Sequence, residues 1–195
     1  MKIIISPEEN LKNETNLINQ FFDQGLDLFH IRKLKFSEMD LINYVFGIDD
    51  KYKEKLVVHQ HFETALQLGL HRFHIKENDR KNESFSFNEN VIYSTSTHSI
   101  EDFNMLENIW EYAFISPIFP SISKIGYGEN SQILSALKKR MNYKTKLIGL
   151  GGITPENQYL AYENGVEGVA FLGSIWKNEN PLKIFEKCIQ KGHLC

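Results

Sequence analysis

Short apolar runs alternate with longer amphipathic stretches along most of the chain. Several of these runs are apolar without a break, which is typical of strands that are covered on both faces in a parallel sheet. In all, eight strand candidates are present, at residues 2–6, 26–32, 55–59, 71–75, 91–95, 112–116, 146–150 and 166–172. Their alternation with helix-length segments predicts parallel strands joined by right-handed crossovers.

Helix-boundary residues flank most of the intervening segments. The signals are an amphipathic stretch over 7–24 that ends at Gly25, serine caps at Ser37 and Ser99, and proline-led helix starts at Thr154-Pro155 and Asn180-Pro181. Residues 76–90 are polar and aperiodic. The helix after the fourth strand is therefore expected to be short or absent.

The eight strand-helix units predict a single-domain (β/α)8 TIM barrel of the α/β class over residues 1–195. The alternative is an open doubly wound sheet. That fold needs a glycine-rich turn after the first strand, and the chain has Ser6-Pro7 there. Although about 250 residues is more typical of a barrel, the number of units favours the barrel.

Composition and charge narrow the class of protein. With 42% hydrophobic and 24% charged residues the chain is globular, and 22 Lys and Arg against 25 Asp and Glu leave a net charge of −3. That balance argues against a nucleic-acid partner, and no apolar run approaches the roughly 20 residues that span a bilayer. Two cysteines make no disulfide framework. We expect a cytoplasmic protein without a membrane partner, and a homo-oligomer is compatible with the sequence.

Two glycine turns suggest a phosphate site. Gly151-Gly152 follows the seventh strand and Gly173-Ser174 follows the eighth, each ahead of an expected helix. Backbone N–H groups at a helix start favour an anion, and the loops after strands seven and eight are the usual phosphate site of these barrels. The alternative is a purely structural role, in which these glycines only make tight turns.

Other candidate binding residues follow the second, third and sixth strands. His30 and Arg32 are two residues apart, so both side chains are expected to face the barrel mouth. Arginine offers a permanently charged fork to a phosphate. The remaining candidates are Lys33 and His59, and then Ser121, Ser123 and Lys124 in a long loop that suits a lid over a phosphorylated ligand.

The fifth strand leads into the polar run 94–99, which contains Ser96 and His98. The hydroxyls in this run could have no role beyond capping the helix that follows. A histidine at a barrel mouth, however, titrates in a range suited to proton transfer near neutral pH. His98 is therefore the candidate catalytic residue, with Ser96 as a binding residue.

Five segments carry a resemblance to a known family. They are HIRKLKFSEMDL (30–41), LVVHQHFETAL (56–66), STSTHSIEDF (94–103), SPIFPSISKIGYG (116–128) and IGLGGITPENQ (148–158). In order and spacing the chain resembles the thiamine phosphate synthase and thiazole tautomerase (TenI-type) superfamily. The resemblance implies a barrel enzyme of thiamine biosynthesis that binds a phosphorylated thiazole or pyrimidine ligand.

The branch depends on where the chain departs from the synthase pattern. The synthases carry Asn-Asp after the third strand, whose Asp helps to bind Mg²⁺, whereas this chain has His59-Gln60. Asp79 corresponds to a second metal-ligand Asp. The resemblance therefore favours a tautomerase that needs no metal or other cofactor and moves a proton with His98. The alternative is a thiamine phosphate synthase with Mg²⁺, in which Asp79 would be a ligand.

Two further alternatives remain open. A barrel that keeps its phosphate turns without its metal ligands could bind a phosphorylated ligand and catalyse nothing. His59 and His61 could hold Zn²⁺ in a metal hydrolase, although ligand spacing alone is weak support. His71 and His74 are expected to be strand-flanking or core histidines whose ring nitrogens are satisfied.

Overall fold

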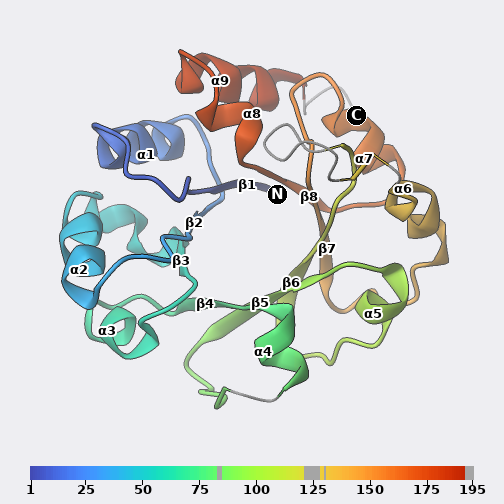
Figure 1. Ribbon diagram of the computed structural model, residues 1–195, viewed down its shortest axis with the longest axis horizontal. Coiled ribbons are helices and arrows are strands. Elements are labelled where there is room, and N and C mark those ends of the chain that lie inside the picture. Colours follow the sequence, from blue (N-terminus) through green and yellow to red (C-terminus); the bar gives the residue numbers. More distant parts are fainter. Residues whose placement is uncertain (83–84, 121–127, 130, 192–195) are drawn as a thin grey trace.

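A computed structural model describes residues 1–82, 85–120, 128, 129 and 131–191. Eight parallel strands form a closed barrel in chain order, and β1 pairs with β8 to close it (Figure 1). The strands are β1 Lys2–Ile5, β2 Leu28–Ile31, β3 Leu56–Val58, β4 Arg72–Ile75, β5 Ile92–Thr97, β6 Trp110–Ile115, β7 Lys146–Leu150 and β8 Gly168–Phe171. The predicted barrel is confirmed.

Helices surround the strands (Figure 1). They are α1 Glu14–Asp23, α2 Glu38–Phe46, α3 Phe62–Gln67, α4 Glu77–Lys81, α5 Ile100–Asn104, α6 Ile133–Ala136, α7 Gln158–Glu163, α8 Gly173–Trp176 and α9 Pro181–Lys191, with 3-10 turns at Asp50–Lys55 and Leu137–Lys139. The helix after the fourth strand is short, as its polar composition predicts. No helix in the described part of the chain is long and apolar enough to cross a membrane.

The predicted helix starts agree with the structure at some positions and differ from it at others. Ser37 forms the expected capping box with Asp40, and the Asn180 side chain accepts from the first turn of α9. The Thr154 hydroxyl accepts from the N–H groups of Glu156 and Asn157, as a capping residue does, but it caps a turn, because α7 begins only at Gln158. The first helix begins at Glu14 and not at residue 7.

Two separate apolar regions hold the barrel together. Between the sheet and the helices, Phe21 packs edge-to-face against Trp176 and Phe185. Inside the barrel, the aliphatic residues Ile3, Ile5 and Ile148 are fully or almost fully buried. The interior also contains polar side chains from β2 to β6, and these form the floor of the candidate site.

Candidate active site at the carboxyl ends of the strands

Three histidines and their hydroxyl partners lie buried near the carboxyl ends of β2, β3 and β4. His30 Nδ1 is 3.0 Å from His59 Nε2, and His30 Nε2 is 2.6 Å from the Tyr112 hydroxyl. His74 lies with each ring nitrogen 2.9 Å from a serine hydroxyl, Ser94 on one side and Ser96 on the other. These contacts confirm the expectation that His74 is a satisfied core residue, and they fix the orientation of the rings.

Burial keeps this cluster uncharged at neutral pH. It lowers the pKa of His30 and of His59 well below the usual histidine value, and it lowers the pKa of His74 to about 3. Burial also raises the pKa of Tyr112. The floor of the barrel mouth therefore consists of neutral imidazoles and hydroxyls.

Positive charge lies above this floor. After burial, the main influences that lower the pKa of His74 are the charges of Arg32 and Lys76. The Arg32 guanidinium is 2.8 Å from Glu8 Oε1 in a partly exposed ion pair. The expectation that Arg32 faces the mouth agrees with the lowering of the His74 pKa by the charge of Arg32. A phosphate arriving here would meet the positive charges of Lys76 and of Arg32, the latter in exchange for its Glu8 partner.

Lys33 makes contacts of a different kind. Its ammonium donates to Glu14 Oε2 and to the Glu9 carbonyl oxygen, each at 2.7 Å, and only 1% of the side chain is exposed. The Tyr44 hydroxyl donates to the other oxygen of Glu14. The ammonium is thus committed to a buried carboxylate, which makes it a poor candidate for holding a ligand.

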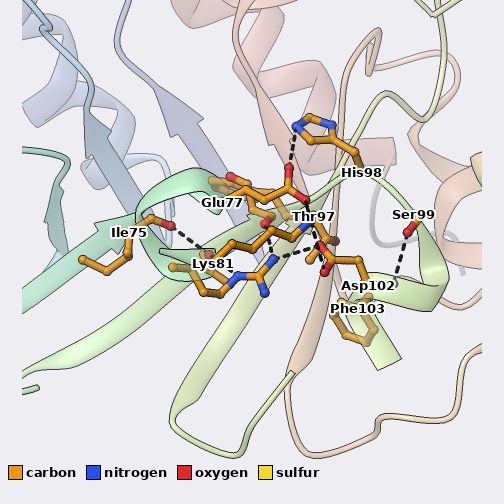
Figure 2. A network of polar contacts seen from close by, with 12 residues as sticks. Ile75, Glu77, Lys81, Thr97, His98, Ser99, Asp102 and Phe103 are labelled. Atoms are coloured by element: carbon orange, nitrogen blue, oxygen red, sulfur yellow. Dashed lines mark hydrogen bonds and ion pairs between the residues drawn. The ribbon is translucent and has the colours of Figure 1, made fainter. Parts of the chain in front are cut away.

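His98 stands at the edge of an ionic network formed by α4 and α5 (Figure 2). Its Nδ1 donates to the Ser116 carbonyl oxygen at 2.9 Å, and its Nε2 is 3.5 Å from Glu77 Oε2. Glu77 also binds Lys81, whose ammonium lies 3.5 Å from Asp102. About half of the His98 side chain is exposed. The network therefore orients an imidazole that solvent or a ligand can reach.

The glycine turn after β7 exists because another loop lies against it. Gly151 has φ +97° and Gly152 has φ +63°. A Cβ on Gly152 would lie 2.3 Å from the Pro120 carbonyl oxygen. The glycines thus have a structural reason of their own, and the phosphate expectation needs support from elsewhere.

Ser174 supplies such support. After β8, Gly173 begins α8, and the Ser174 hydroxyl is buried with no hydrogen-bond partner among the described residues. An unsatisfied buried hydroxyl is uncommon and calls for a partner. The three loop residues Ser121, Ser123 and Lys124 lie outside the described residues.

The described side chains do not form a Mg²⁺ site of the oxygen-rich kind. The Gln60 amide donates to the Lys33 and Phe36 carbonyl oxygens, so it holds the loop after β2. Asp79 lies in α4 at the surface, and Asp102 is bound by Arg80 at 2.8 Å. Within the described ranges, a group of three potential metal ligands is found only at His30, His59 and His74. The alternative zinc pair is not supported, since His61 Nε2 lies 2.6 Å from the Phe36 carbonyl oxygen.

A family model described as thiamine monophosphate synthase matches residues 1–175. The chain belongs to this family. The thiamine-phosphate synthase of Bacillus thuringiensis subsp. konkukian is 26% identical over 154 residues, covering 74% of this chain and 68% of the relative. That of Methanobrevibacter smithii is 20% identical over 190 residues, covering 92% and 88%.

Solved structures agree with this assignment. The thiamine phosphate pyrophosphorylase of Bacteroides thetaiotaomicron superposes with a TM-score of 0.79 at 26% identity, covering 100% of this chain and 98% of the other. The Pyrococcus furiosus protein of the same name superposes at 0.77 with 17% identity, covering 98% and 94%, which supports the fold alone. The chain is therefore a member of a thiamine-biosynthesis enzyme family, and the names of its relatives favour the synthase alternative over the tautomerase expectation.

Sequence reasoning missed three residues of this site. Tyr112 was assigned only to a strand, although its alternation with Phe114 indicates two side chains on the same face. Lys76 and Glu77 directly follow the fourth strand, which is the position where barrel site residues are found. The residues directly after the fourth strand were therefore a sequence signal for Lys76 and Glu77.

Proposed function

We propose that this protein catalyses the thiamine-phosphate synthase reaction, joining a hydroxymethylpyrimidine pyrophosphate to a thiazole phosphate. The names of the relatives, thiamine-phosphate synthases, support this activity. The observation that carries the proposal is a floor of neutral imidazoles and hydroxyls on which the positive charges of Arg32 and Lys76 act. Among the described residues, the carboxylate paired with Arg32 is that of Glu8, at 2.8 Å, and a pyrophosphate would replace it as the partner of the guanidinium.

The reaction breaks one bond and forms another. The bond between the pyrimidine methylene carbon and the pyrophosphate oxygen breaks, and the electron pair leaves with pyrophosphate. The thiazole ring nitrogen supplies the pair for the new C–N bond. Arg32 and Lys76 would stabilise the charge that grows on the leaving group, because positioned cations are most effective where charge develops. No step is assigned to Mg²⁺, since the described side chains do not fit it.

We assign the thiazole phosphate to the turns after β7 and β8. Gly151-Gly152 and Gly173-Ser174 would surround this group, and the unpartnered Ser174 hydroxyl would donate to it. Ser121, Ser123 and Lys124 belong to the same proposal as further binding residues for the anion. His30, His59 and Ser96 would form the floor beneath the rings, and His98 would lie at their edge.

Tautomerisation of a thiazole phosphate is the second candidate. It is favoured by the orientation of His98 between the Ser116 carbonyl oxygen and Glu77. One imidazole can take a proton from one ring position and return it at another, and positioned acid-base catalysis contributes about 10²–10⁴-fold. Under this alternative Arg32 would bind the phosphate equally in the ground and transition states.

A single set of assays separates these candidates. The purified protein is given the thiazole phosphate tautomers, with and without the pyrimidine pyrophosphate and Mg²⁺, and products are resolved by chromatography. Formation of thiamine phosphate supports the synthase proposal. Interconversion of the tautomers alone, abolished in His98→Asn, supports the second candidate. Saturable binding without any product contradicts both and leaves the non-catalytic alternative.

Variants sharpen the result. Arg32→Gln should lower kcat of the synthase reaction, because the arginine acts on charge that develops in the transition state. Lys138→Gln, on an exposed lysine of the turn after α6, serves as the matched control for loss of one positive charge. Equal kcat in Arg32→Gln and Lys138→Gln would contradict the role given to Arg32.

A further inference from the structure

Three imidazoles from neighbouring strands meet inside the barrel mouth. His30 lies in β2, His59 directly follows β3 and His74 lies in β4. One ring nitrogen of each lies within 4.8 Å of those of the other two, and all three side chains are buried. The His59 and His74 rings lie 4.4 Å apart and nearly parallel. No step of the proposed reaction explains why three imidazoles should be brought together here.

The spacing of the closest pair suits a metal ion. His30 Nδ1 and His59 Nε2 are 3.0 Å apart. Two nitrogen ligands at Zn–N distances of about 2.0–2.1 Å in a tetrahedral site lie about 3.3 Å from each other. The ligating nitrogen of His74 lies within 4.8 Å of this pair, and to bind the same ion it would give up one of its two serine contacts.

The partners of the rings are those that support metal-bound histidines. Tyr112 lies at the far nitrogen of His30, and Ser94 and Ser96 flank His74. A hydroxyl can accept the N–H of an imidazole and so fix which nitrogen presents its lone pair.

The donor set selects the class of metal. Three neutral imidazoles suit Zn²⁺, Co²⁺, Ni²⁺ or Cu²⁺, whereas Mg²⁺ prefers oxygen ligands. Three protein ligands also leave one position of a tetrahedral ion open, as in catalytic zinc sites. His59 is the most exposed of the three at 7%, which puts the accessible side of the cluster next to this residue.

The surrounding charge determines what fills the open position. Arg32 and Lys76 act on His59 and His74 as positive charges, and no carboxylate belongs to the cluster. A divalent cation here therefore lacks a compensating negative charge from the described residues of the cluster, and burying it alone is costly. An anion in the fourth position would supply that charge and would be attracted by the same two cations.

We propose that His30, His59 and His74 bind one borderline transition-metal ion, such as Zn²⁺, with a phosphate oxygen as the fourth ligand. The site differs in residues and in metal class from the Mg²⁺ site expected of the synthase branch. The metal part is independent of the proposed function, because it concerns binding and not turnover. The anion part predicts that metal and inorganic phosphate strengthen the binding of each other by the same factor.

The test is a titration of the chelator-treated full chain, produced without a polyhistidine tag, with Co²⁺ followed by visible absorption. We expect one Co²⁺ per chain with the strong absorption of a tetrahedral site, displacement by Zn²⁺ but not by Mg²⁺, and tighter binding when inorganic phosphate is present. His59→Gln and His74→Gln should each weaken Co²⁺ binding by at least about tenfold. His71→Gln changes an exposed histidine outside the cluster and should leave binding unchanged.

Several outcomes would overturn the proposal. They are the absence of Co²⁺ binding, the weak spectrum of an octahedral ion, and equal affinity in the parent and His59→Gln. Since His74→Gln removes a fully buried side chain, its folding is checked by circular dichroism, and His59→Gln carries the test if it does not fold. Co²⁺ binding to the three histidines whose affinity is the same with and without inorganic phosphate would overturn the anion part alone. None of these results depends on whether thiamine phosphate is formed.

Discussion

Lys33 and Glu14 form an ion pair that is sealed inside the protein. The ammonium lies 2.7 Å from Glu14 Oε2, and the two side chains are 1% and 3% exposed. Burial lowers the pKa of Lys33 and, with the Glu14 carboxylate, raises that of Tyr44. The pair joins the loop after β2 to the first turn of α1 and so fixes the residue that follows Arg32.

Breaking this pair should destabilise the fold. Lys33→Met leaves the Glu14 carboxylate buried without its cation, and the expected loss is about 3–5 kcal/mol in the free energy of unfolding. Adding Glu14→Gln should recover part of the loss, because a neutral amide still accepts from Tyr44. Urea denaturation measures both effects.

Lys53→Met is the matched control for this prediction. Lys53 pairs with Asp50, of which 84% is exposed, so its loss should cost less than about 1 kcal/mol. A Lys33→Met protein as stable as its parent, but with weakened affinity for a phosphorylated ligand, would contradict this structural role. It would return Lys33 to the binding site expected from the sequence.

The ion pair also illustrates what the sequence could not reveal. Lys33 follows a strand end, which is where site residues of a barrel lie, and its partner is 19 positions away in a helix. Whether an ammonium turns toward the mouth or toward α1 depends on side-chain packing, which has no periodic signature. Only the position of Lys33 in the barrel could be predicted.

Strands were easier to predict than the contacts between them. The apolar runs and the crossover rule together determine the eight parallel strands. Closure of the barrel brings Tyr112 of β6 to His30 of β2, 82 positions apart. Such a contact depends on strand stagger, so no local pattern could identify the hydroxyl partners of the histidines. The later start of α1 has a similar origin, since the side chain of Glu14 accepts from the Leu11 N–H ahead of it.

Acid should destabilise the protein through its buried histidines. The unfolded chain takes up protons on histidine below pH about 6.5, whereas His74 in the folded protein remains neutral until pH about 3. The stability contributed by a neutral His74 is therefore present above about 6.5 and is lost as the pH falls toward 3. We expect His74 to account for a loss of about 1.4 kcal/mol per pH unit across this window.

The comparison that checks this effect is the pH slope of the unfolding free energy between pH 6.5 and about 4.5. His74→Gln should flatten that slope relative to the parent, whereas His71→Gln, at an exposed position, should leave it as it is. Parallel slopes in the parent and His74→Gln would mean that His74 gains its proton in the folded state as readily as in the unfolded state.

Substitution at Gly152 should destabilise the fold more than a positive φ alone explains. Gly152→Ala combines φ +63° with a Cβ 2.3 Å from the Pro120 carbonyl oxygen. Gly69 has φ +79° with no atom within 4 Å of the added Cβ. Gly69→Ala therefore measures the conformational cost alone, about 1–2 kcal/mol. Thermal unfolding should show a larger loss for Gly152→Ala, and equal losses would mean that the Pro120 loop moves aside freely.

Ser174→Ala should change stability and ligand binding in opposite directions. In the free protein the hydroxyl is buried without a partner among the described residues, so removing it should leave the free energy of unfolding unchanged or raise it by about 1 kcal/mol. If the hydroxyl donates to the phosphate of a bound thiazole phosphate, the same change should weaken binding by about 10-fold, the effect of losing a hydrogen bond to a charged group. Calorimetric titration with thiazole phosphate and urea denaturation together measure the two effects.

Ser135→Ala, on an exposed serine of α6, is the control and should alter neither binding nor stability appreciably. Reduced stability with unchanged affinity in Ser174→Ala would instead indicate a hydroxyl that supports the fold, and the phosphate would then have to lie elsewhere at the barrel mouth.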